Sequence, residues 1–387
     1  MDPFPSLWLA SLPIFLIGSQ QSVTQTSAVH SDQLEAAVRL VEKEVATGAV
    51  GAAALLVARN GLVAVERGFG RLSRDPSSKP CQSQSIFLVA SISKPVTAMA
   101  VMRLVDQGRI RLDDPAQNYL PEFTGDGRER ITIRNLLSHT SGLPDMLPEN
   151  IELRKRQAPL KEFVALTLRT PLLFPPGSHV SYQSMGILLA AEIVERVTGK
   201  PLDAFLQQEV FAPLKMRHSS MGIGRRNIAD TVQCDLPSSG DLRMSAGDRA
   251  WNWNSSYWRK LGVPWGGMHS TVSDIYRLLQ AMLDHGSGVL KPELGQAMIT
   301  DQNKGLNRPW GLGWEVGKGV FFEGSPAKAF GHRGATGTLC WADPDRKLVF
   351  VLFTNRPLDN DKSKFLERVA KLVSDAVPGE GGNSDTG

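Results

Sequence analysis

The sequence contains little of what marks several classes of protein. Only 3 of its 387 residues are cysteine, and Cys81, Cys234 and Cys340 lie too far apart for a disulfide framework or a zinc site. The 43 Lys and Arg residues barely exceed the 39 Asp and Glu residues and are scattered along the chain. A nucleic-acid partner needs a concentrated basic face. We therefore expect neither a metal ion nor a nucleic-acid partner.

Long hydrophobic runs are also scarce. The apolar segment 7–17 is too short to span a bilayer, and Pro13 interrupts it. A polar segment follows, as after the core of a signal peptide, but Asp2 stands where positive charge is expected. Residues 1–30 are thus either a signal peptide or a flexible arm. Export to the periplasm or medium and a cytoplasmic location both stay open, and any membrane association would come through this segment alone.

Several catalytic motifs are missing. The chain has no Gly-x-Ser-x-Gly elbow, no His-Glu-x-x-His, no Gly-x-x-x-x-Gly-Lys loop and no Gly-x-Gly-x-x-Gly. These absences argue against an α/β-hydrolase, a metalloprotease, a nucleotide hydrolase and a nicotinamide enzyme. We expect no cofactor.

Hydrophobic patterning predicts an α/β protein. A helix from Ser31 or Asp32 precedes two strand-like runs that are joined through Asn60-Gly61, a strong hairpin signal. The segment 116–260 is mostly helical, whereas two strands (338–342 and 348–354) and a terminal helix follow it. We expect one domain over 31–378, with an α/β part (31–115 and 261–378) and a helical insertion (116–260), followed by a flexible tail (379–387).

Ser-x-x-Lys occurs twice, at Ser91 to Lys94 and at Ser325 to Lys328. Ser91 follows an apolar run and opens a helix, where residues three apart share a face, so the amine of Lys94 can reach the hydroxyl of Ser91. A serine nucleophile needs such a base, and burial would lower the pKa of a lysine enough to make it one. Spacing leaves another interpretation open, in which Ser91 caps the helix and Lys94 is solvated.

The surroundings of Ser91 resemble a known family. The chain is similar, from about residue 33 to 375, to the class C β-lactamase-like serine hydrolases, which include penicillin-binding proteins, D,D-peptidases and family VIII-type carboxylesterases. The resemblance rests on separated motifs in the family's order: Ser91-Ile92-Ser93-Lys94, Leu137-Ser138-His139-Thr140-Ser141-Gly142-Leu143, Tyr182-Gln183-Ser184 and Gly331-His332-Arg333-Gly334. It implies an antiparallel sheet flanked by helices beside a mostly helical domain, with the site in the cleft between them.

The resemblance also implies roles for single residues. Ser91 would be the acylated nucleophile, Lys94 its activating partner and Tyr182 the second base. His332 would stand on the strand that faces the substrate. The backbone N–H groups of Ser91 and Ala335 would form the oxyanion hole.

The sequence departs from the family's pattern at three of these positions. Ser184 replaces the Asn that usually follows the tyrosine, and His332 replaces Lys, so a permanent charge is missing near neutral pH. Arg333 is bulkier than the usual Thr and is expected to narrow the cleft or bind a carboxylate. Gly334, which has no Cβ, would let the backbone approach the substrate closely. These changes favour an esterase or peptidase over an efficient β-lactamase.

The resulting prediction is a cofactor-free serine hydrolase that cleaves a small ester, amide or peptide through an acyl-serine intermediate. Two alternatives remain at this stage. The protein could bind or sense penicillin, acylating without efficient turnover, or it could use an idle enzyme scaffold for a structural role. Trp265, Trp310 and Trp314 would either wall an acyl pocket or belong to the aromatic core.

Overall fold

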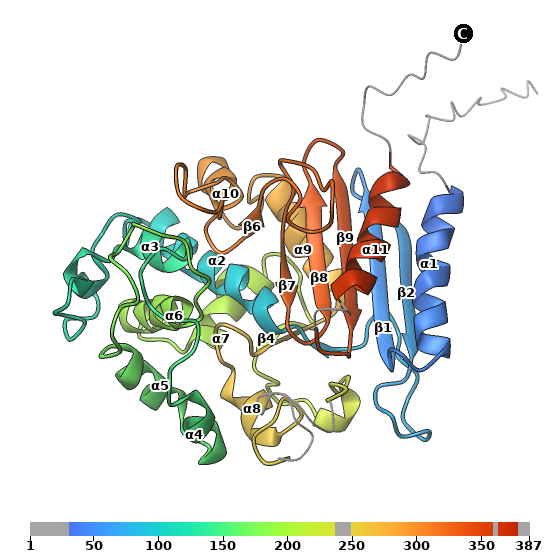
Figure 1. Ribbon diagram of the computed structural model, residues 1–387, viewed down its shortest axis with the longest axis horizontal. Helices are drawn as coiled ribbons and strands as arrows, with labels where there is room; N and C mark the ends of the chain where they lie inside the picture. Colours follow the sequence, from blue (N-terminus) through green and yellow to red (C-terminus); the bar gives the residue numbers. More distant parts are fainter. Residues whose placement is uncertain (1–30, 237–248, 359–362, 378–387) are drawn as a thin grey trace, which may run out of the picture.

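The computed structural model describes residues 31–236, 249–358 and 363–377 (Figure 1). The signal peptide or arm predicted for residues 1–30 and the tail predicted for 379–387 lie outside the described residues.

The larger of two sheets has six antiparallel strands in the order β2-β1-β9-β8-β7-β6. Its strands are β1 (Ala52–Arg59), β2 (Leu62–Gly70), β6 (Glu315–Val316), β7 (Phe330–Gly334), β8 (Thr338–Asp343) and β9 (Leu348–Thr354). Because β1 pairs with β9, the two ends of the chain close the sheet together. The predicted pairs of strands are confirmed, and at the β1–β2 turn both Asn60 (φ 52°) and Gly61 (φ 77°) have the positive φ that such a hairpin requires.

Helices cover both faces of this sheet, as predicted (Figure 1). Helices α1 (Ser31–Ala46) and α11 (Ser363–Asp375) lie side by side on one face, and α9 (Val272–Leu283) packs on the other. Alternate side chains of β1 serve the two faces, since Leu55 joins the cluster under α1 and α11 while Leu56 joins the opposite core.

The other helices gather beside the sheet, on the left in Figure 1, except α10, which lies above β6. They are α2 (Ser93–Asp106), α3 (Ile133–Leu137), α4 (Asn150–Lys155), α5 (Leu160–Thr167), α6 (Met185–Thr198), α7 (Leu202–Leu206), α8 (Ser256–Leu261) and α10 (Pro292–Met298). In the described part of the chain, no helix combines the length and the apolar character that crossing a bilayer requires. The domain limits given above stay a prediction.

A second, three-stranded sheet connects the two regions. Its strands β3 (Phe87–Leu88), β4 (Ser220–Met221) and β5 (Met268–Ser270) are only two or three residues long and are ordered β3-β5-β4. Strand β3 ends just before Ser91, so this sheet supports the segment that carries the predicted nucleophile.

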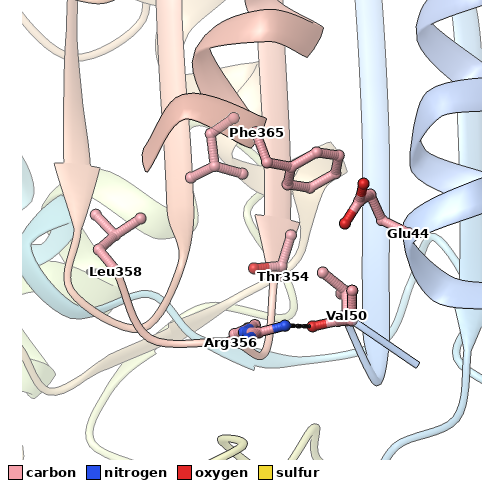
Figure 2. Close-up of a pocket in the computed structure, with 8 residues that line it drawn as sticks. Glu44, Val50, Thr354, Arg356, Leu358 and Phe365 are labelled. Atoms are coloured by element: carbon pink, nitrogen blue, oxygen red, sulfur yellow. Dashed lines mark hydrogen bonds between the residues drawn. The ribbon is translucent and has the colours of Figure 1, made fainter. Parts of the chain in front are cut away.

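A small cavity of about 30 Å³ lies where α1, α11 and the end of β9 meet (Figure 2). Glu44 and Phe365 face each other across it, and Arg356 closes one side by donating a hydrogen bond to the carbonyl of Ala49. It is too small for a substrate. Leu358 lines both this cavity and the larger one described next.

Candidate active site

The two Ser-x-x-Lys segments have different environments. The side chain of Ser325 is buried and its Oγ accepts a hydrogen bond from the N–H of Phe321, while Lys328 lies at the surface, 2.8 Å from Asp345. Ser91 is half-buried and lines a cavity. Lys94 is only 1% exposed, and its Nζ donates to Ser91 Oγ at 3.1 Å. The interpretation in which Lys94 is solvated is therefore wrong.

A sharp turn presents Ser91 to the cavity. The N–H of Val89 still bonds to Met268 of β5, but Ala90 takes a left-handed conformation (φ 47°), which is uncommon for a residue other than glycine. A 3₁₀ turn over Ala90–Ile92 then leads into α2. The hydroxyl of Ser93 holds the turn by donating to the carbonyl of Ala90 at 2.6 Å. Strained backbone of this kind is characteristic of positions that must place a functional side chain.

The hairpin between β7 and β8 is tied to the segment before Ser91. Thr336 Oγ1 donates to the carbonyl of Leu88 at 2.7 Å, and Thr338 Oγ1 donates to that of Val89 at 3.0 Å. Gly334 makes this approach possible, because a Cβ there would lie 2.3 Å from the Val89 oxygen. The glycine therefore accommodates the turn before Ser91, and Ala335 comes to the same cavity wall as Ser91.

Burial dominates the charge state of Lys94. Loss of hydration lowers its pKa from 10.5 to about 7, and the negative charges of Asp145 and Glu315 limit the decrease. A second acceptor, the carbonyl of Trp265 at 3.0 Å, fixes the amine. A substantial fraction of Lys94 is thus neutral near pH 7 and able to accept a proton.

Tyr182 stands next to this amine. Its half-buried phenol comes just before α6, and Lys94 Nζ lies 4.6 Å from the centre of its ring. Burial raises the pKa of Tyr182 well above 10, and a hydrogen bond with Ser91 opposes that rise. The phenol is therefore protonated near neutral pH and can pass a proton along a chain of hydrogen bonds.

Two buried histidines flank Tyr182. The ring centre of His139 is 4.9 Å from that of Tyr182, and the ring centre of His332 is 6.1 Å away. Burial lowers the pKa of His332 to about 3, so this side chain is neutral, and its Nδ1 lies 2.6 Å from the carbonyl of Arg333. His139 Nδ1 accepts the N–H of Gln183 at 3.3 Å, which ties its own turn to the one carrying Tyr182. Trp310 packs against both histidines.

Arg333 does not take the place expected of it. Its guanidinium donates to the carbonyls of Val320 at 2.6 Å and Phe321 at 2.8 Å, and Arg333 is absent from the residues that line the cavity beside Ser91. Neighbouring side chains of a strand point to opposite faces, so turning His332 toward Tyr182 turns Arg333 away. We therefore no longer count Arg333 among the substrate contacts.

The cavity that Ser91 lines, the candidate catalytic cavity, has a volume of about 260 Å³. Its walls are mostly apolar and aromatic, with a few polar groups: Leu88, Ala90, Ser91, Asp145, Met146, Asn150, Arg154, Tyr182, Ser184, Trp253, Trp258, Trp265, Gly266, Ala335, Thr336 and Leu358. Of the three tryptophans singled out from the sequence, Trp265 lines the cavity, whereas Trp314 packs in the core with its ring centre 5.5 Å from that of Phe330.

Sequence reasoning missed two charged residues in this wall. The hydroxyl of Ser184 donates to Asp145 Oδ1 at 2.6 Å. Arg154 is buried, its guanidinium carbon lies 4.1 Å from the ring centre of Trp258, and it donates to the carbonyl of Trp251 at 3.2 Å. Asp145 follows the Ser-Gly-Leu motif closely enough to have been noticed, but nothing near Arg154 in the sequence indicates a cavity.

Comparison with known proteins gives a consistent result. The family model described as Beta-lactamase matches residues 37–374. The chain is 31% identical over 324 residues to esterase EstB of Burkholderia gladioli, covering 76% of this chain and 80% of the esterase. It is 27% identical over 369 residues to an N-acetylmuramyl-L-alanine amidase of Bacillus subtilis (strain 168), covering 86% and 83%. A solved penicillin-binding protein homologue from Caulobacter crescentus has a similar fold, with 24% identity, a TM-score of 0.73 and coverage of 88% and 98%.

Proposed function

Because the chain belongs to the β-lactamase family and is a serine hydrolase of ester or amide bonds, we propose that Ser91 is its acylated nucleophile and that short-chain carboxylic esters are its preferred substrates. The observation that carries this proposal is the buried amine of Lys94, 3.1 Å from a serine hydroxyl that lines a cavity.

Acylation begins with proton transfer from Ser91 Oγ to neutral Lys94. The oxygen attacks the carbonyl carbon of the substrate, and the negative charge that develops on the carbonyl oxygen is stabilised by the N–H groups of Ser91 and Ala335. One such donor typically contributes ~10²–10³ in rate. Tyr182, within hydrogen-bond reach of Ser91, relays the proton to the leaving group as the bond to it breaks.

Deacylation uses the same groups in reverse order. Neutral Lys94 takes a proton from a water molecule, directly or through the phenol of Tyr182, which passes its own proton on as it receives one, and the resulting hydroxide attacks the carbonyl carbon of acyl-Ser91. The bond to Ser91 Oγ breaks, the oxygen regains a proton and the carboxylic acid leaves. His332, neutral and packed near the ring of Tyr182, keeps that ring in place rather than supplying charge.

The character of the cavity supports a small ester as substrate. Trp253, Trp258 and Trp265 give it aromatic walls, and the hydroxyl of Ser184 already donates to Asp145. Position 184 therefore offers neither the amide of the usual Asn nor a free hydroxyl donor to an acylamido side chain of a substrate. Peptides of D-amino acids and weak turnover of β-lactams rank behind esters, and the relatives do not favour the alternative of acylation without turnover.

The two Ser-x-x-Lys segments provide a matched test. Lys94→Ala should lower kcat/KM for a short-chain p-nitrophenyl ester by at least ~10²-fold, because the nucleophile loses its base. Lys328→Ala, which removes only a surface ion pair, should leave kcat/KM unchanged. Equal activity in both variants would overturn the assignment, and circular dichroism would show that both are folded.

A further inference from the structure

Asp145 is a charged group that the hydrolytic steps do not use. It is the one carboxylate among the described residues that line the catalytic cavity. The other charged residue of that wall, Arg154, is stacked on Trp258 and bonded to the carbonyl of Trp251. Asp145 is half-buried in a wall that is mostly apolar and aromatic, where a carboxylate loses part of its hydration and gains from a cationic partner.

The position of this carboxylate is fixed. Its Oδ1 accepts the hydroxyl of Ser184 at 2.6 Å, and the backbone carbonyl of Asp145 accepts the N–H of Ser184 at 3.3 Å. Ser184 is two residues from Tyr182 and directly precedes α6, so the carboxylate is held at the level of the reacting groups. Among the described residues Asp145 is in no salt bridge; its side chain bonds to Ser184, and its charge acts on Lys94 without direct contact.

We propose that Asp145 binds a protonated amine on the acyl part of the substrate, so that the enzyme prefers esters and amides of amino acids to their uncharged analogues. The inference rests on the proposed function, because it places the amine beside the carbonyl that Ser91 attacks. An ammonium group would pair with the carboxylate inside the cavity, and the side chain of the amino acid would lie against the aromatic walls.

The electrostatics of the base agree with this arrangement. The negative charge of Asp145 raises the pKa of Lys94 and so keeps part of the base protonated in the free enzyme. A bound ammonium would cancel that charge and release more neutral Lys94 when the matching substrate is present. Lys94 interacts electrostatically with five titratable groups: Asp145, Glu315, Tyr182, His139 and His332.

Two esters that differ only in the amine test the inference. Methyl phenylalaninate, as each enantiomer, and methyl 3-phenylpropanoate are compared at a pH at which the amine is protonated, with the released acid measured by chromatography. The wild-type enzyme should hydrolyse one enantiomer of methyl phenylalaninate with a higher kcat/KM than methyl 3-phenylpropanoate. Asp145→Asn, which keeps an acceptor for Ser184, should reduce the ratio of the two kcat/KM values roughly 10- to 100-fold.

The matched control is Glu149→Gln, which removes an exposed carboxylate outside the cavity and should leave the ratio as in the wild type. Wild-type enzyme that hydrolyses both esters with equal kcat/KM, or an Asp145→Asn ratio equal to that of the wild type, would overturn the inference while the hydrolase function stands. If the wild-type enzyme hydrolyses neither ester, both the proposed ester substrates and the inference are overturned. Thermal melting of each variant shows whether a change in the ratio accompanies a loss of fold.

Discussion

Activity should decline as the pH is lowered through about 7, because Lys94 must be neutral to accept the proton of Ser91. Burial lowers the pKa of Lys94 from 10.5 to about 7. At pH 7 about half of the enzyme then carries neutral Lys94, against roughly 3 in 10⁴ for a lysine with an ordinary pKa. The buried site thus raises the active fraction by about 10³, and kcat/KM should fall about tenfold for each pH unit below 6.

The assay is kcat/KM for a neutral ester across the pH range, which reports the pKa values of the free enzyme. A histidine cannot cause the same inflection, since burial lowers the pKa of His332 to about 3 and that of His139 well below 6.5. Glu315→Gln removes a charge that raises the pKa of Lys94, so it should move the inflection to lower pH. An inflection near 10, or one that is unmoved in Glu315→Gln, would refute the reasoning.

Three further predictions concern stability. Lys94→Met should stabilise the fold by ~3 kcal/mol at pH 6. The lowering of the pKa of Lys94 from 10.5 to about 7 corresponds to ~5 kcal/mol of destabilisation, and the two hydrogen bonds lost with the amine offset ~2 kcal/mol of the gain. The destabilisation is complete below about pH 7 and disappears as the pH rises toward 10.5, so melting curves should show the gain at pH 6 and not at pH 10.5. Gly334→Ala should lower the melting temperature and slow acylation. A Cβ at this position would clash with the carbonyl oxygen of Val89 and destabilise the fold by ~1–3 kcal/mol. An unchanged melting temperature would contradict the close packing. Arg333→Ala should lower the free energy of unfolding by ~1–3 kcal/mol, because the hydrogen bond to the carbonyl of Val320 is lost. The KM for a neutral ester should stay as in the wild type, and a raised KM would indicate that Arg333 contacts the substrate.

Local signals explain how much of the fold could be predicted. The Asn60-Gly61 turn and the continuous apolar run of β1 both depend on residues close in the sequence. The three short strands β3, β4 and β5 escaped prediction because segments of two or three residues have no detectable period, and only long-range pairing creates them.

The candidate site likewise contains residues that the sequence predicts and residues that only tertiary packing places there. Ser91 and Lys94 are three residues apart, within one helical turn, so their proximity follows from their spacing. Only the family resemblance predicted that Tyr182 belongs to the same site. Neighbouring side chains of a strand point to opposite faces, so His332 and Arg333 cannot both face the substrate. The charged wall residues Asp145 and Arg154 come to the cavity only through tertiary packing, which no local pattern reports.

The mass of the protein after mixing with an activated short-chain ester tests the central claim most directly. Intact mass would be followed over time, and the modified residue would be located by peptide mapping, with Ser91→Ala treated in parallel. We expect a transient acyl adduct on the peptide that contains Ser91, its disappearance as acid is released, and no adduct in the variant. An adduct that persists in Ser91→Ala, or that maps to Ser325, would contradict the account.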